Sequence, residues 1–288
     1  MNFKKKKQFI FVLSLFLLVF SALILVAPAL SFGEGTNKDI LSHLEGKKNS
    51  VELFPEWKNI EKGIDLQIIN LFNQLEEIEV QLRLYRFNPE LFNIRVLCSK
   101  NYGHKRAKVK TLAKLSGTVA IINSSYFDMQ GNPLAYLKCN GKVVNGKMAT
   151  HSLYSGVFFV KQGRSYIVHS SKFNPKIEVS DAVQVGPRLL SKGKNTIGLK
   201  NIHAVHHRSG IALDRKGNVM IYATSSEFNG ISWDRLRYFL KLKKIGGYEV
   251  LNLDGGGSTQ MYISTKNFED SILGLSPVPS AIAFFRKE

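Results

Sequence analysis

The sequence contains little cysteine. Cys98 and Cys139 are the only two in 288 residues, and they do not form a CxxC pair. Zinc ribbons and dithiol redox sites need that spacing, so neither is indicated. Both cysteines lie in strand-like stretches and can pair in an oxidising compartment. No sequence rule fixes the distance between their Cα atoms, so a disulfide and two buried free thiols both remain open.

Several catalytic and architectural signatures are also missing. There is no GxSxG elbow, no Walker loop and no HExxH motif, so an α/β-hydrolase serine, a P-loop and a zincin helix are not indicated. There is no internal repeat and no low-complexity block. We therefore predict a linker or N-terminal extension over 34–62 and one sizeable domain over 63–288.

Acidic residues are scarce relative to basic ones. The chain has 22 Asp and Glu against 40 Lys and Arg, a formal net charge of +18, of which Lys4–Lys7 supply four. Such an excess attracts anionic lipids, phosphate-bearing polymers or nucleic acid. An exported protein rarely meets nucleic acid, so we expect cell-envelope anions and no nucleic-acid partner. The alternative is a solvated basic surface without a specific ligand.

The N-terminus predicts export. A basic stretch, Lys4–Lys7, precedes an uncharged run from Phe9 to Ala27, and small residues flank Pro28. Residues 1–33 are therefore predicted to be a signal peptide or an uncleaved signal anchor. Either form predicts a periplasmic or extracellular location. An anchor formed by residues 9–27 would also associate the protein with a membrane.

The remainder predicts a single α+β domain of mixed or antiparallel sheets with a few packed helices. Alternating or apolar runs predict strands at Gly63–Leu71, Ile78–Phe87, Asn93–Cys98, Thr118–Ile122, Tyr248–Leu253 and Ala281–Phe285. Helical spacing predicts Arg106–Leu115 and Ser232–Lys243, the latter capped by Ser232. Glycine-containing turns predict hairpins at 140–141, 162–163 and 216–218.

The loop Leu251–Thr259 is the strongest candidate site. An apolar strand delivers Asp254 to three consecutive glycines, followed by Ser258 and Thr259. Consecutive N–H groups in a glycine loop can form a concavity that binds anions. A carboxylate, such a concavity and two hydroxyls indicate a site for a phosphorylated or sugar-like substrate. The alternative is a glycine-rich turn in which Asp254 caps its own loop.

Three other clusters carry polar groups at predicted strand ends. Asn123–Asp128 directly follows a predicted strand. Val185–Leu190 contains a Gly-Pro bend before Arg188, and in His206–Asp214 the guanidinium of Arg208, just before a strand, can clamp a phosphate. Each has a plainer interpretation as a turn or a surface arginine. The histidines 203, 206 and 207 lack a nearby cysteine or an acid before Asp214, so no metal site is predicted there.

Six motifs in this order resemble the phosphodiester glycosidase family. They are NSSYFD (123–128), SGVF (155–158), GPRLL (186–190), RSGI (208–211), GISWDRL (230–236) and NLDGGGS (252–258). The resemblance covers roughly Gly63 to Phe285, and NLDGGGS is its most specific element. The chain departs from the family pattern at Ser124-Ser125 and at Ala212, where other small residues are usual. These changes suggest a retained fold with a slightly reshaped pocket.

The resemblance implies hydrolysis of a sugar-1-phosphodiester at the anomeric carbon, without a cofactor. Asp254 would act as base or nucleophile, Arg208 would stabilise the leaving phosphate, and Asn123 would bind a sugar hydroxyl or phosphate oxygen. The implied substrate-binding residues are Gly186, Asp128, Gly255, Gly256 and Ser258. The substrate would be a sugar phosphate or glycopolymer.

Two rival functions remain open at this stage. A non-catalytic protein with the same fold could bind anionic envelope glycopolymers without cutting them. A metal-dependent phosphodiesterase that uses the histidines would cut the P–O bond instead, and a chelator would inactivate it.

Overall fold

The computed structural model describes residues 56–73, 78–196, 198, 201–225 and 227–288, which belong to one compact unit of the chain, Val51–Glu288. The predicted signal or anchor over 1–33 lies outside the described residues, as does most of the predicted linker over 34–62. Within the described ranges, no helix has the length and apolar character needed to cross a membrane.

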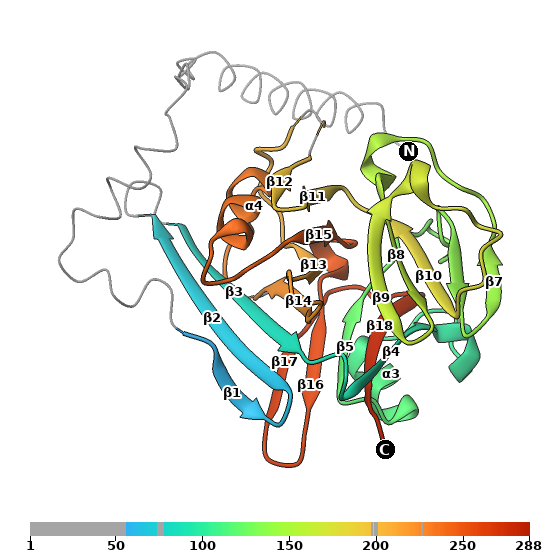
Figure 1. Ribbon diagram of the computed structural model, residues 1–288, viewed down its shortest axis with the longest axis horizontal. Coiled ribbons are helices and arrows are strands. Elements are labelled where there is room, and N and C mark those ends of the chain that lie inside the picture. Colours follow the sequence, from blue (N-terminus) through green and yellow to red (C-terminus); the bar gives the residue numbers. More distant parts are fainter. Residues whose placement is uncertain (1–55, 74–77, 197, 199–200, 226) are drawn as a thin grey trace, which may run out of the picture. The chain divides into compact units, whose positions relative to one another are not determined.

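Three antiparallel sheets make up this unit (Figure 1). The first has the order β1 (Lys58–Glu61), β2 (Ile64–Asn73), β3 (Ile78–Phe87), β14 (Val219–Thr224), β13 (Ser209–Leu213), β15 (Glu249–Asn252), β11 (Arg188–Ser191) and β12 (Lys194–Asn195). The second has the order β7 (Lys142–Asn145), β6 (Leu137–Cys139), β10 (Asp181–Val185), β8 (Gly156–Lys161) and β9 (Arg164–His169). The third has the order β17 (Glu269–Ile272), β16 (Met261–Ser264), β5 (Ala120–Asn123), β18 (Ser280–Arg286) and β4 (Phe92–Cys98).

Helices contribute less than the predicted α+β class implies. Among the described residues only two α-helices occur, α3 (Val109–Ser116) and α4 (Trp233–Lys241), so the fold is predominantly β. The Ser232 side chain caps α4 by accepting the N–H of Arg235 at 3.2 Å, as predicted. The helix α3 begins later than predicted, because the backbone of Ala107 is extended and exchanges two hydrogen bonds with Val278.

The predicted hairpin turns are confirmed. Asn140-Gly141 joins β6 to β7, and Gln162-Gly163 joins β8 to β9, with φ positive at all four residues. Two central residues with positive φ match the right-handed twist of the strands that they connect. In the β13–β14 turn, the Asp214 carboxylate instead accepts the N–H groups of Lys216 and Asn218.

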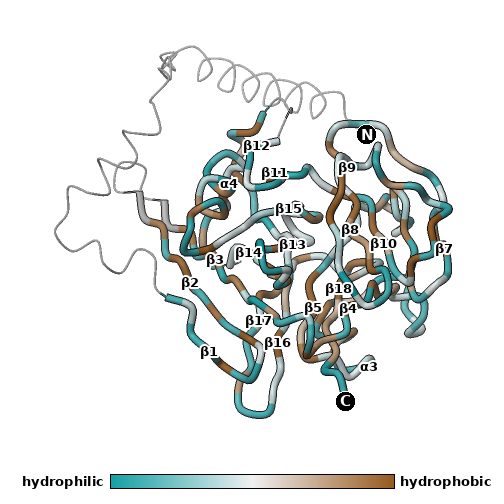
Figure 2. The backbone as a smooth tube through the Cα atoms, viewed as in Figure 1, coloured by the Kyte–Doolittle hydropathy of each residue, from teal (hydrophilic) through white to brown (hydrophobic). Residues whose placement is uncertain are grey.

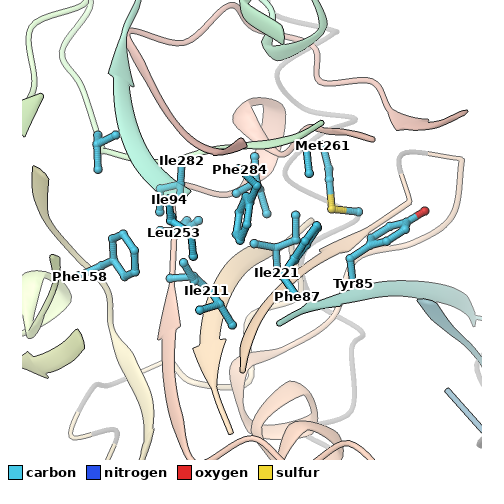
Figure 3. Close-up of a cluster of buried hydrophobic side chains, with 14 of the residues drawn as sticks. Tyr85, Phe87, Ile94, Phe158, Ile211, Ile221, Leu253, Met261, Ile282 and Phe284 are labelled. Carbon is cyan, nitrogen blue, oxygen red and sulfur yellow. The ribbon is translucent and has the colours of Figure 1, made fainter. Parts of the chain in front are cut away.

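The core extends over both faces of the eight-stranded sheet. On β3, Val80, Leu82 and Leu84 pack with the buried face of α4, whereas Tyr85 and Phe87 pack on the opposite side with residues of the other sheets. Figure 3 shows part of this second cluster, including Leu253, and Figure 2 shows hydrophobic residues along β5 and β8. Because both faces are covered at the centre of the sheet, the strands β13, β14 and β15 are buried almost throughout.

A disulfide and a buried acid join the second and third sheets. Cys98 on β4 and Cys139 on β6 are bonded, with their Cα atoms 6.1 Å apart. Beside them the Asp181 carboxylate accepts the N–H groups of Val96 at 3.0 Å and Asn140 at 2.9 Å, and it pairs with Arg95 at 2.8 Å. The structure thus shows that Cys98 and Cys139 form a disulfide, whereas the sequence was compatible with either a disulfide or two free thiols.

Candidate active site

Strand register brings the main candidate residues together. In β13 and β15, Gly210 lies opposite Asn252, so Arg208 before β13 and Asp254 after β15 emerge at the same end of the sheet. The loop after β5 joins them, since Asp254 N–H donates to the Ser124 carbonyl at 3.0 Å. Three segments far apart in sequence therefore meet at Asp254.

The backbone of Asp254 is held from several sides. Its carbonyl oxygen accepts the Asn123 amide (Nδ2) at 2.6 Å and the Ser209 hydroxyl at 2.8 Å. The Asn123 Oδ1 also accepts the N–H of Gln260 at 3.1 Å. The preceding residue, Leu253, is fully buried in the core (Figure 3). The position of Asp254 is therefore set by the fold rather than by its own loop.

The Asp254 carboxyl group is suited to exchanging a proton near neutral pH. Burial raises its pKa to about 6, although hydrogen bonds from the Ser258 hydroxyl and the Gly255 N–H favour the ionised form. The residue as a whole stays partly exposed, so a substrate can reach it. A carboxyl group with these properties is a candidate general base or nucleophile.

The glycines allow the loop to lie directly against the segment that carries Arg208. A Cβ at Gly255 would lie 2.8 Å from the carbonyl oxygen of His207. Gly256 has φ +57° and donates its N–H to that same carbonyl at 2.8 Å. The N–H groups of Gly255 and Gly256 are thus occupied within the protein, and these two glycines shape the loop.

Arg208 is a buried cation that pairs with no carboxylate among the described residues. It is 5% exposed, and Nε and Nη2 donate to the carbonyls of Ile231 at 3.1 Å and Ala204 at 2.7 Å. Its guanidinium carbon lies 4.2 Å from the centre of the Trp233 ring. Burial lowers its pKa to about 10, so it stays charged at neutral pH. Nη1 has no hydrogen-bond partner in the described part of the chain, which leaves it available to an anion.

Tyr126 connects the acid, the arginine and the Gly186 turn. Its hydroxyl donates to the Gly186 carbonyl at 2.6 Å. Burial raises its pKa, and the charges of Asp254 and Arg208 both act on it, which places the two groups in one neighbourhood. Asn252 donates to the same carbonyl at 3.1 Å and accepts the Trp233 indole N–H at 3.1 Å.

Gly186 itself occupies a position where only glycine fits. Its φ is +157°, and an added Cβ would lie 2.5 Å from the carbonyl oxygen of Leu153. The peptide bond that follows, to Pro187, is cis. Arg188, two residues on, forms an ion pair with Glu249 at 2.9 Å and so belongs to the sheet framework.

The site gathers most of the residues that the sequence indicated. Asp254, Arg208, Asn123, Gly186, Gly255, Gly256 and Ser258 lie around the Asp254 loop. Asp128 forms its side-chain hydrogen bonds elsewhere. Its carboxylate accepts the backbone N–H and the side-chain amide of Asn132, at 2.8 and 3.0 Å, in a turn of its own. The Asn123 amide is occupied on both sides by backbone groups, so its contacts are those of a positioning residue.

Sequence analysis missed five contributors: Ser124, Tyr126, Ser209, Trp233 and Asn252. All five lie inside the six motifs, so their signal was present without an assigned role. The histidines have separate structural roles. His206 forms a β-bridge with Ile231, and the carbonyl of His207 accepts the N–H of Gly256. Among the described residues, no three His, Cys, Asp or Glu side chains are grouped to hold a metal ion.

Hydrolases that act on anionic substrates typically combine an acid of raised pKa with a nearby cation. Asp254 on its glycine-rich loop and the buried Arg208, whose Nη1 is available to an anion, provide these two groups. The chain belongs to the phosphodiester glycosidase family, whose model matches residues 116–285 and thus includes every residue of the site. A search of curated proteins found no match.

Two solved structures show the same fold. One is the zebrafish N-acetylglucosamine-1-phosphodiester alpha-N-acetylglucosaminidase catalytic domain, auto-inhibited by its pro-peptide, with a TM-score of 0.61 and 16% identity over 84% of this chain and 86% of that one. The other is a hypothetical protein from Synechocystis, with a TM-score of 0.56 and 16% identity over 81% of this chain and 64% of that one. At these identities the likeness concerns the fold alone.

Proposed function

We propose that this protein is an exported hydrolase that cleaves a sugar-1-phosphodiester bond in a cell-envelope or extracellular glycoconjugate. The observation that carries the proposal is that Asp254, whose pKa is raised to about 6, and Arg208, which pairs with no carboxylate among the described residues, lie around the same Tyr126 hydroxyl and both act on its pKa. Family membership supports the reaction type. The zebrafish relative is named for a substrate of this kind, an N-acetylglucosamine-1-phosphodiester.

The proposed reaction breaks the bond between the anomeric carbon and the phosphate oxygen. That oxygen leaves with the bonding electron pair as part of a phosphate monoester, while a water oxygen becomes bonded to the carbon. Ionised Asp254 either takes the proton from the attacking water or first bonds the carbon as a nucleophile. Both routes need the carboxylate form, so the rate rises with pH through about 6.

Arg208 would stabilise the leaving group. A phosphate monoester is stable as an anion, so its departure needs a nearby positive charge more than a proton. The two carbonyls and the indole ring hold the guanidinium in place, and Nη1 is free to meet a phosphate oxygen. Such a preorganised cation is worth roughly a hundredfold to a thousandfold in kcat.

Three further side chains would position the reacting groups without touching the substrate. Asn123 and Ser209 hold the carbonyl of Asp254, and Ser258 orients its carboxylate. Loss of one of these should lower kcat more than it raises KM, because it moves the carboxylate and leaves other substrate contacts in place.

A hydrolysis assay with matched variants tests the proposal. Full-length wild type, Asp254→Asn, Arg208→Gln and Asp128→Asn are compared on an aryl sugar-1-phosphodiester, with and without EDTA. We expect Asp254→Asn and Arg208→Gln to lose at least about a hundredfold in kcat/KM. Asp128→Asn makes the same chemical change at a turn carboxylate and should stay active. Undiminished hydrolysis by Asp254→Asn would refute the assignment, and loss of activity in EDTA would favour a metal-dependent phosphodiesterase.

Export is part of the proposal and has separate support. A disulfide joins Cys98 to Cys139, and such bonds persist mainly in oxidising compartments. If the protein is exported, thiol labelling of material from cells should find both cysteines oxidised and the protein outside the cytoplasm. Reduced cysteines in a cytoplasmic fraction would contradict this part. Whether residues 9–27 remain as a membrane anchor is decided by comparing soluble and membrane fractions.

A further inference from the structure

A hollow lies at the end of the eight-stranded sheet opposite the Asp254 site. It has a volume of about 820 Å³ and is lined by the ends of β2 and β3, the β13–β14 turn and the segment from Lys241 to Tyr248. Register places these parts together, since Phe87 lies opposite both Ile64 and Val219, and Leu213 lies opposite both Val219 and Glu249.

This hollow is separate from the Asp254 site. The strand β13 begins at Ser209, which bonds the carbonyl of Asp254, and ends at Leu213, next to Asp214 in the lining of the hollow. A strand of this length spans roughly 15 Å. The lining of the hollow therefore does not include the Asp254 carboxylate, and the side chains of the two sites can be altered independently.

The lining is strongly basic. It contains six cationic side chains, Arg86, Arg215, Lys216, Lys241, Lys243 and Lys244, against two acids. Both acids are occupied, because Asp65 pairs with Arg86 at 2.8 Å and Asp214 accepts hydrogen bonds within its own turn. Lys244 pairs with Glu56 at 3.5 Å. The remaining four cations have no carboxylate partner among the described residues.

The basic character belongs to this hollow and is not a uniform result of composition. A hollow of about 680 Å³ near β4 has a comparable size, but Arg95 is its only charged lining residue, and it pairs with Asp181 at 2.8 Å. Positively charged side chains repel one another when they are close, so their clustering around one hollow suggests an anionic partner.

We propose that this basic hollow, called the basic cleft from here on, binds a linear polymer with repeating phosphate groups. Lys216, Lys241 and Lys243 are exposed, and a single exposed pairing contributes little to affinity. Several such contacts to successive phosphates add together and release counterions, which favours a polyanion over one small anion. The ring of Tyr248, 5.3 Å from the guanidinium carbon of Arg215, supports that cation at the wall. This binding goes beyond the proposed hydrolysis, because it does not involve Asp254.

Binding of poly(glycerol phosphate) to the full-length protein tests this inference. The variant Lys216→Gln/Lys241→Gln/Lys243→Gln is compared with the control Lys142→Gln/Lys161→Gln/Lys176→Gln, which removes the same charge from exposed lysines of the second sheet and a loop beside it. We expect the cleft variant to bind roughly tenfold more weakly than wild type, and the control to bind within about twofold. Affinity for wild type should also fall steeply as salt is raised.

Four outcomes would overturn the inference. Two concern the variants: both triple variants weaken polymer binding equally, or the cleft variant binds the polymer as tightly as wild type. Two concern the ligand: wild type binds glycerol phosphate monomer as tightly as the polymer, or it binds phosphatidylglycerol vesicles or single-stranded DNA more tightly than the polymer. Asp254→Asn should bind the polymer as wild type does, and the cleft variant should hydrolyse a small soluble phosphodiester normally. These two measurements separate a failure of the cleft from a failure of the proposed hydrolysis.

Discussion

Replacing Asp254 by asparagine is expected to stabilise the fold while it removes hydrolysis. Burial raises the pKa of this carboxyl group from an ordinary 3.8 to about 6. At neutral pH the folded protein therefore holds an ionised group where its surroundings favour the neutral one. The gap between the two pKa values corresponds to roughly 3 kcal/mol of lost stability. Asparagine is neutral and of nearly the same shape, so it relieves most of that cost.

The sign of the effect depends on pH. Below about pH 4 the carboxyl group is protonated in both the folded and unfolded states, and the two proteins should have similar stability. Between about pH 4 and pH 6 the unfolded chain loses the proton first, so wild-type stability falls as pH rises. Above about 6 the difference is complete. Catalysis needs the carboxylate, so activity should increase over the upper part of the range in which stability is lost.

Urea denaturation of full-length wild type, Asp254→Asn and Asp128→Asn at about pH 4 and pH 8 measures this effect. Asp254→Asn should gain up to about 3 kcal/mol at the higher pH, a rise in Tm of several degrees, and little at the lower. Asp128→Asn serves as the control of opposite sign, because hydrogen bonds from Asn132 lower the pKa of Asp128 and its ionised form stabilises the turn. If Asp254→Asn is no more stable than wild type at pH 8, or gains equally at pH 4, the reasoning is refuted.

Three further predictions concern the supports of the site. Asn123→Ala removes one buried and one partly buried hydrogen bond and should cost about 2–3 kcal/mol in urea denaturation, with kcat falling more than KM rises. An unchanged kcat would contradict its positioning role. Trp233→Leu removes the ring beside Arg208, worth about 0.5–2 kcal/mol, so kcat should fall several-fold in steady-state kinetics, and an unaltered kcat would count against the contact. Replacing Cys98 and Cys139 by alanine opens a cross-link between residues 41 apart and should lower the free energy of unfolding by about 4 kcal/mol; wild type in reductant should match the double variant.

Local features of the fold were predictable because they depend on near neighbours in the chain. The strand Ile78–Phe87 has the predicted bounds, the Ser232 cap forms, and the glycine turns join the expected strands. Tyr85 shows the limit of this reasoning. In a strand, adjacent residues such as Leu84 and Tyr85 point to opposite faces, but only the packing of the other sheets against the second face buries Tyr85 as well as Leu84.

The residues of the candidate site show the same contrast between contacts within one loop and contacts between distant segments. Asp254 and Ser258 lie within one loop, so their contact follows from chain proximity. Asp128 carries the same chemical group, yet its carboxylate bonds within its own turn, with Asn132, Gln130 and Gly131, and nothing in the motif distinguished it from a catalytic acid. Ser280, whose hydroxyl bonds those of Ser124 and Ser125 at 2.7 and 2.6 Å, had no sequence signal, because its partners lie more than 150 residues away.

The amino-acid sequence specifies the chemical groups that are present: the family motifs, the carboxylate on its glycine loop, the arginine before its strand, the two cysteines and the excess of basic residues. These depend on residue identity and short-range backbone preferences. The packing of distant segments is what places Arg208 beside the Asp254 loop, pairs the cysteines, and gathers around one hollow four cations that have no carboxylate partner in the described part of the chain. It also decided the raised pKa of Asp254, since burial depends on register and packing between segments distant in the chain.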